Sequence, residues 1–324
     1  MLGRNDSNPT KNQMRIVSLI PSATEIVCAL GFESSLVGRS HECDYPETVK
    51  RLPACCEPKF DPKGTSLEID QHVQTLVRES LSVYRVNAKK LKELKPDIIV
   101  TQDHCDVCAV SLEDVKRAVC EWLDSKSKIV TLRPDGLSDV WKGIGDVAEA
   151  LGCPEKAKTL VQQYQNRMHA VSEKARRLGR SPSIVCIEWF DPLMSAANWM
   201  PEFVKMLGGV NLFGESGRHS PRIAWEDVRR KNPDIFVLMP CGWNIGHSLE
   251  EITTLTQKPG WDELKAVRNG QVYIAESNQY FNRPGPRLVE SLEILAEIMY
   301  PDSFQLGYEG KGWQRFETEA SKNS

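Results

Sequence analysis

The chain has 324 residues, which suggests about two domains at roughly 150 residues per domain. Hydrophobic residues make up 40% and charged residues 26%, which is typical of a globular protein and excludes a disordered or fibrous chain. The net charge of -3 provides no attraction to nucleic acid or to an anionic membrane surface, so we expect neither as a partner.

Residues 1–13 are polar and lack the apolar core of a signal peptide. The most apolar stretch, 16–30, is interrupted by Pro21 and Glu25, so the sequence predicts no membrane span. Without an export signal, the ten cysteines are expected to be thiols in a reducing compartment. We therefore predict a cytoplasmic protein, which we expect to be a monomer.

Short apolar runs alternate with longer helical patterns in the first part of the chain, as in a parallel sheet with crossover helices. The expected strands are 15–19, 36–38, 98–101 and 129–132. The expected helices are 24–30, 67–79, 88–94 and 112–123. Together these elements predict an α/β lobe over residues 14–135.

Residues 137–178 have a helical pattern with one break at 152–154. The part after the break has about two dozen residues, so as a helix it would be about 35 Å long. That length is sufficient to reach from one domain to another. Residues 136–180 are therefore expected to be linking helices.

The alternation of strands and helices resumes after residue 180. The expected strands are 184–188, 235–239 and 272–275, and the expected helices are 200–207, 225–231, 260–263 and 286–299. These elements predict a second α/β lobe over 181–300, followed by a loop-like tail, 301–324, in which Trp313 packs on the rest. The predicted fold is thus two Rossmann-like lobes with parallel sheets, joined by a long backbone helix, with a ligand cleft between them.

Ligands of open parallel sheets bind at the carboxyl ends of the strands. The first expected strand is followed by Ser22 and Thr24, at the start of a helix whose free N–H groups could hold an anionic or carbonyl group of a ligand. The alternative is that these side chains only cap the helix.

Two loops after first-lobe strands carry clustered cysteines. His41 and Cys43 follow the second strand, and Cys105 and Cys108 form a Cys-x-x-Cys pair after the strand that ends at Thr101. This spacing allows two thiolates to converge, so the four residues could bind zinc or the thiols could react. The alternative is inert, partly buried thiols. Cys55 and Cys56 are adjacent in a loop, and no function is assigned to them.

Second-lobe strands end in segments that combine aromatic and polar residues. These residues are Glu188, Trp189, Trp243, Asn278, Tyr280, Phe281 and Arg283, with Trp199 nearby in the sequence. A single tryptophan is most simply explained by core packing. Repetition at three strand ends instead indicates a flat, mostly apolar ligand whose polar edges are held by Glu188, Asn278 and Arg283.

Several segments together resemble a known family. These are 15–25 (RIVSLIPSATE), 44–46 (DYP), 94–99 (LKPDII), 232–234 (NPD), and Tyr280-Phe281 followed by Arg283, Pro286 and Arg287. They resemble the cobalamin-binding proteins of the helical-backbone substrate-binding class that serves metal-chelate ABC transporters. The resemblance extends over about 15–300, and it implies two lobes around a long helix.

The resemblance implies that cobalamin or a related metal chelate binds in the cleft. The implied contacts are Ser22 and Thr24, the region of Tyr45, and second-lobe aromatics such as Trp189 and Tyr280. It also implies one docking carboxylate on each lobe for an ABC transporter. Glu226 fits the second-lobe position, but the first-lobe position falls near Lys89, which reverses the charge and argues against docking.

Three functions are compatible with the sequence, and the weakest of them is a transporter component that is exported by an unrecognised route. The first is a cytosolic binding protein for a corrinoid-like or other metal-containing ligand, with His41 or a cysteine as an axial ligand. The second is a metal- or thiol-dependent enzyme that uses the cluster of His41, Cys43, Cys105 and Cys108, with Glu188 or Asp103 transferring protons. We favour the first, because the resemblance extends over nearly the whole chain, whereas no spacing typical of a catalytic motif is present.

Overall fold

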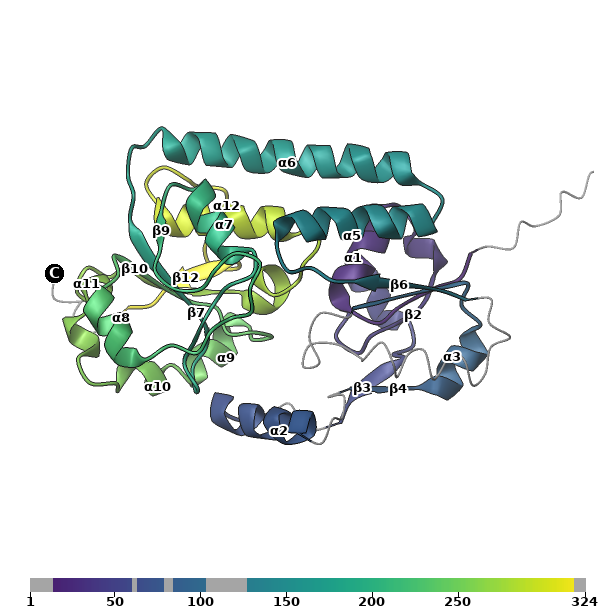
Figure 1. Ribbon diagram of the computed structural model, residues 1–324, viewed down its shortest axis with the longest axis horizontal. Helices are drawn as coiled ribbons and strands as arrows, with labels where there is room; N and C mark the ends of the chain where they lie inside the picture. The colour runs from purple at the N-terminus through teal and green to yellow at the C-terminus, as the bar shows by residue number, and fades with distance from the viewer. Residues whose placement is uncertain (1–13, 60–62, 79–83, 103–126, 318–324) are drawn as a thin grey trace, which may run out of the picture.

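The computed structural model describes residues 14–59, 63–78, 84–102 and 127–317. Two α/β lobes lie side by side beneath one long helix (Figure 1). The predicted fold class is therefore confirmed. The expected helix 112–123 lies outside the described residues.

The first lobe is built on a four-stranded parallel sheet in the order β2-β1-β5-β6. The strands are β1 (Ile16–Ser18), β2 (Leu36–Arg39), β5 (Ile98–Gln102) and β6 (Lys128–Leu132). The helices are α1 (Pro21–Ala29), α3 (Ala88–Leu94) and α5 (Leu137–Ala150). Val17, Ile99 and Val100 are fully buried in the sheet, which explains why these strands are nearly continuous apolar runs.

A short antiparallel ribbon extends from this lobe. Its strands are β3 (Cys56–Pro58) and β4 (Tyr84–Val86), and α2 (Ser66–Arg78) lies between them in the sequence. The sequence predicted the helix but neither strand, because three-residue strands leave no readable alternation.

The second lobe has a larger, mixed sheet in the order β12-β11-β10-β7-β8, with β9 also paired to β7. Its strands are β7 (Ser183–Trp189), β8 (Met194–Ser195), β9 (Val210–Asn211), β10 (Ile235–Leu238), β11 (Val272–Ala275) and β12 (Trp313–Arg315). Its helices are α7 (Met200–Met206), α8 (Trp225–Lys231), α9 (Ile245–Glu250), α10 (Thr253–Thr256), α11 (Lys265–Arg268), the π-helix η4 (Ser277–Phe281) and α12 (Leu288–Met299).

The tail differs from the expected loop, because β12 pairs antiparallel with β11. The buried carboxylate of Glu297 on α12 organises this pairing. It accepts hydrogen bonds from the backbone N–H of Gly307 at 2.8 Å and of Tyr308 at 3.2 Å, and from Trp313 Nε1 at 2.7 Å. Residues this far apart leave no local sequence pattern, which is why only the packing of Trp313 was predicted.

The linking helix α6 (Pro154–Arg176) confirms the predicted long helix. Ala157 near its start belongs to the core of the first lobe, whereas Met168, Val171 and Ala175 belong to the core of the second. Figure 1 shows α6 lying over α5 of one lobe and α12 of the other. Each lobe is therefore packed against a different half of the same helix.

Candidate ligand-binding site

A cavity of about 1330 Å³ lies between the lobes. Residues after four parallel strands line it: Ser22 after β1, Gln102 at the end of β5, Trp189 at the end of β7 and Cys241 after β10. The cavity therefore lies where the strand-end rule predicts a ligand. It exceeds the range of about 300–1,000 Å³ that is usual for drug-sized ligands, so it suits a larger molecule.

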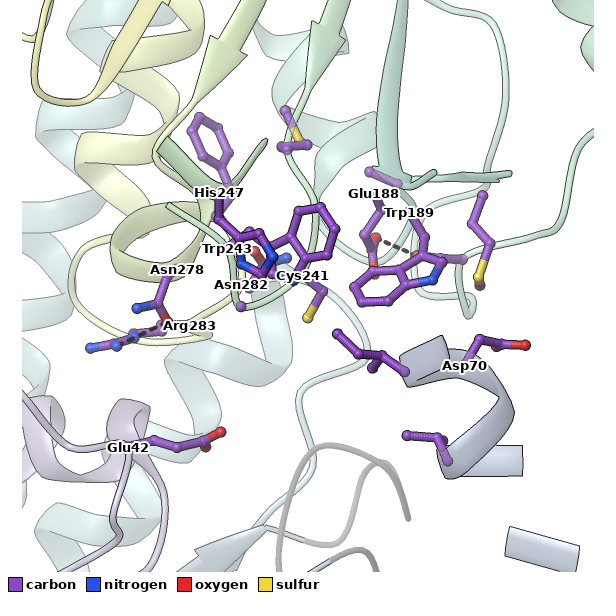
Figure 2. Close-up of a pocket in the computed structure, with 18 of the residues that line it drawn as sticks. Glu42, Asp70, Glu188, Trp189, Cys241, Trp243, His247, Asn278, Asn282 and Arg283 are labelled. Atoms are coloured by element: carbon purple, nitrogen blue, oxygen red, sulfur yellow. Dashed lines mark hydrogen bonds between the residues drawn. The ribbon is translucent and has the colours of Figure 1, made fainter. Parts of the chain in front are cut away.

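Aromatic side chains form the second-lobe wall of the cavity (Figure 2). The ring centroids of Trp189 and Trp243 are 5.3 Å apart, and Trp243 stacks on His247 at 3.9 Å. Trp199 and Phe281 also line the cavity and are joined by a hydrogen bond of 3.1 Å from Trp199 Nε1 to the Phe281 carbonyl. These fixed rings provide a broad apolar surface. His247 was not predicted, because it lies on α9, a short helix that the sequence analysis did not identify.

Glu188 provides a carboxyl group beside the tryptophans. Ser220 Oγ donates a hydrogen bond of 2.5 Å to Glu188 Oε2. Burial raises the pKa of Glu188, and the bond from Ser220 only partly opposes this effect. Glu188 is therefore protonated at a higher pH than an exposed glutamate, and in that form it can donate a hydrogen bond to a ligand.

Three side-chain atoms on the cavity wall are buried without a hydrogen-bond partner among the described residues. They are Ser22 Oγ, Gln102 Oε1 and Asn282 Oδ1. Burying unpaired polar groups costs free energy. A ligand with polar edges would supply the missing partners, so these atoms are candidate contacts.

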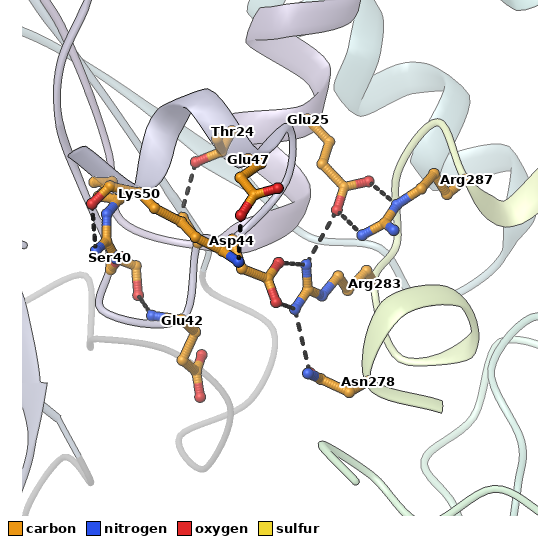
Figure 3. Close-up of polar contacts among 12 residues, drawn as sticks. Thr24, Glu25, Ser40, Glu42, Asp44, Glu47, Lys50, Asn278, Arg283 and Arg287 are labelled. Carbon is orange, nitrogen blue, oxygen red and sulfur yellow. Dashed lines mark hydrogen bonds and ion pairs between the residues drawn. The ribbon is translucent and has the colours of Figure 1, made fainter. Parts of the chain in front are cut away.

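At the edge of the cavity, an ion network joins the lobes (Figure 3). Glu25 of α1 accepts bonds from Arg287 Nε at 2.9 Å and Nη2 at 2.6 Å, and from Arg283 Nη1 at 3.3 Å. Arg283 also binds both carboxylate oxygens of Asp44 and donates to Asn278 Oδ1 at 3.2 Å. Arg283 thus lines the cavity, as predicted, and its charge is already paired.

Asp44 makes this network sensitive to acid. Burial opposes ionisation, but the hydrogen bonds and charge of Arg283 outweigh burial, so the pKa of Asp44 lies below its usual 3.8. The ionised group therefore stabilises the fold above about pH 3.8, and this contribution is lost as the pH falls through the lowered pKa. We expect the urea midpoint to fall more between about pH 5 and pH 3 in the wild type than in Asp44→Asn. An equal fall of the urea midpoint in the wild type and in Asp44→Asn would contradict this assignment.

Three of the residues predicted to contact the ligand do not line the cavity. Thr24 is fully buried, and its Oγ1 lies 2.8 Å from Ser18 Oγ and 3.0 Å from Cys43 Sγ, so it supports the loop from behind. Tyr45 is 49% exposed, and Arg287 lies 4.2 Å above its ring. Tyr280 lies 5.5 Å from the same guanidinium. Ser22, by contrast, lies on the wall.

Only part of the predicted cysteine cluster lies in the described residues. Cys105 and Cys108 lie outside the described residues. Cys43 is buried against Thr24, and His41 Nδ1 lies 3.4 Å from Cys56 Sγ, a thiol to which no function was assigned. Within the described ranges, no group of three or more His, Cys, Asp or Glu residues could hold a metal ion. His41 lines the cavity and, of this set, is the residue best placed to contact a ligand.

The residues before and within α2 form a wall that the sequence did not predict. Gly64, Thr65, Ile69, Asp70 and Val73 all line the cavity. An amphipathic pattern identified the helix, but nothing in the pattern indicated which surface its apolar face would meet.

Comparison with known proteins relates this architecture to a family. The family model described as periplasmic binding protein matches residues 16–278. An uncharacterized ABC transporter substrate-binding lipoprotein of Bacillus subtilis is 26% identical over 300 residues, which cover 91% of this chain and 82% of the relative. A vitamin B12-binding protein of Vibrio vulnificus is 24% identical over 286 residues, covering 87% and 89% respectively.

Solved structures share the fold. A periplasmic heme binding protein from Pseudomonas aeruginosa superposes with a TM-score of 0.70 at 20% identity, covering 94% of this chain and 98% of the other. The vitamin B12 binding protein of Vibrio cholerae gives 0.64 at 22% identity, covering 90% and 98%. Among the described helices, none has the length and hydropathy needed to cross a bilayer. With a family match over most of its length and a two-lobed fold around one long helix, the chain belongs to the periplasmic binding protein family.

Proposed function

We propose that this protein binds a large metal-chelate macrocycle, of the corrinoid or haem type, in the cavity between its lobes. The main support is the cavity, which has a volume of about 1330 Å³ and is lined by tryptophans on one side. A flat ring system can lie against Trp189 and Trp243, while polar groups at its edge reach Ser22, Gln102 and Asn282. The vitamin B12-binding and heme-binding relatives support this choice of ligand class.

The test is absorbance titration of the purified protein with cyanocobalamin and, separately, with haemin. Saturable binding of one of them at one molecule per chain would support the proposal. Elemental analysis of protein purified from its own source without chelators provides an independent measure, because cobalt or iron would co-purify with the ligand. No saturable binding of either probe, and no metal in the native protein, would contradict it.

Replacing Trp243 by Leu is expected to weaken binding of the probe about tenfold to a hundredfold, because the ligand loses an aromatic face. The matched control is Trp141→Leu. Trp141 stacks on Tyr164 at 6.1 Å between α5 and α6 and does not line the cavity. The Kd values of the two variants are measured by the same titration, and circular dichroism confirms that both variants are folded. Equal Kd values in the two variants would place the ligand elsewhere.

We further propose that the protein acts as a cytoplasmic carrier and not as the docked component of a transporter. Seven cysteines in the described residues are free thiols, as suits a reducing compartment. The resemblance implies docking carboxylates at Glu226 and near Lys89, and these two residues are both exposed and carry opposite charges. Cell fractionation tests this location, and recovery of the native protein outside the cytoplasm would contradict it.

A further inference from the structure

The segment 63–76, which we name the arm, belongs to the first lobe in the sequence but is bound by the second. The ribbon of β3 and β4 connects it to the first lobe. Figure 1 shows α2 beyond this ribbon, on the open side of the space between the lobes. The arm therefore crosses the cleft on the side opposite α6.

Ser66, the first residue of α2, is completely buried and uses all its polar groups to bind the second lobe. Its N–H lies 2.8 and 2.9 Å from the two carboxylate oxygens of Glu251, and its Oγ donates to Glu251 Oε1 at 2.6 Å. Its carbonyl accepts a bond of 3.1 Å from Trp189 Nε1. A carboxylate at a helix N-terminus is stabilised by charge-assisted bonds and by the helix dipole. We call the Ser66–Glu251 contact the latch.

The next turns of α2 continue the contact with the second lobe. Ile69 packs against the apolar cluster that contains Val185, Phe190 and Trp243, and Asp70 lies 3.5 Å from Arg222. Together with Ser66 and Val73, these residues recur at the three- and four-residue spacing of one helix face. Ile69, Asp70 and Val73 also line the cavity, so part of the face that holds the arm against the second lobe also encloses the ligand site.

We propose that the arm is a strap that closes the cleft, and that ligand enters and leaves when the latch opens. The inference rests on the proposed function, because it concerns access to the same cavity. The lobes share α6, so a change in their separation is restricted on that side. Release of the arm requires at least the loss of the Glu251 bonds, the Trp189 bond, the Asp70–Arg222 ion pair and the packing of Ile69.

Cys241 provides a ligand-free measure of access, because it lines the cavity and is a free thiol. Its labelling by a polyethylene-glycol maleimide is followed by peptide mass spectrometry in Glu251→Ala and in a control, Glu263→Ala. Glu263 is an exposed second-lobe carboxylate paired with Arg229, and it does not line the cavity. Loss of charge-assisted hydrogen bonds is expected to raise the open population, and hence this labelling rate, about tenfold or more. N-ethylmaleimide, which is small enough to enter the closed cleft, should show a much smaller change.

The probe that binds in the titration, cyanocobalamin or haemin, is then used in stopped-flow mixing. Opening of the strap should raise its association and dissociation rates together, so that Kd changes less than either rate. Ser66→Ala, which removes one donor and keeps the second lobe intact, should give a smaller change in the same direction. Labelling and exchange rates equal to those of Glu263→Ala would overturn the strap. If neither probe binds the wild type, the proposed function fails, while the Cys241 rates still decide whether the arm controls access.

Discussion

Replacing Glu25 by Gln is expected to lower the free energy of unfolding by about 3–5 kcal/mol, because removal of one member of a buried ion network leaves an uncompensated charge. Glu25 is 3% exposed and accepts bonds from both Arg283 and Arg287. In this variant Arg283 still has Asp44 as an ion-pair partner. The guanidinium of Arg287 loses its carboxylate and retains its contacts with the rings of Tyr45 and Tyr280. Urea unfolding followed by circular dichroism measures the change.

The matched control is Glu47→Gln, at a carboxylate that is 89% exposed and 3.7 Å from Lys50. This change is expected to alter the free energy of unfolding by less than about 0.5 kcal/mol. The double variant Glu25→Gln, Arg287→Met removes both charges and should recover part of the loss, since the penalty comes from the unpaired ion. A loss below about 1 kcal/mol in Glu25→Gln would contradict this account of the network.

The second large effect is expected at Glu297. Replacing it by Ala should cost about 3 kcal/mol or more, because each buried donor left without a partner costs about 1–3 kcal/mol. The donors affected are the buried indole of Trp313 and the partly buried N–H groups of Leu306, Gly307 and Tyr308. Amide exchange over Trp313–Arg315 should also become faster, since β12 loses the anchor that holds it against β11.

Glu309→Ala is the control for the tail, because Glu309 is exposed in the same segment. It should leave both the unfolding free energy and the exchange of β12 close to wild type. If Glu297→Ala unfolds like the control, or if it is destabilised with unchanged exchange in β12, then Glu297 does not anchor the tail.

Elements with strong local patterns could be predicted from the sequence. The buried strands β5 and β10 begin with runs of three or four apolar residues, and α6 has a helix-starting proline and a long helical pattern. The strand-end rule then located Ser22, Trp189 and Trp243 on one cavity, because it depends only on the direction of parallel strands.

Contacts between distant residues could not be predicted in this way. Arg283 and Glu25 are 258 positions apart, and Ser66 and Glu251 are 185 apart. No sequence periodicity relates such pairs. The contact between the ring of Tyr45 and Arg287 could therefore not be foreseen, and Tyr45 was instead expected to contact a ligand. The same limit applies to Cys56, whose neighbour His41 comes from a different loop. The geometry of the predicted cluster with Cys105 and Cys108 stays a prediction.

The long helix α6 has a consequence for where this chain can be divided. Ala157 contributes to one apolar core and Met168, Val171 and Ala175 to the other, while Tyr164 between them packs against both. A fragment that ends before α6 would expose the apolar residues of the first core that α6 covers. A fragment that begins after α6 would expose the corresponding residues of the second core. The smallest autonomous piece containing either lobe must therefore include the helix, and a single copy of α6 cannot serve two separated halves. Dissection of this protein into independent domains, as is routine for chains joined by a loose linker, is thus precluded by its own architecture.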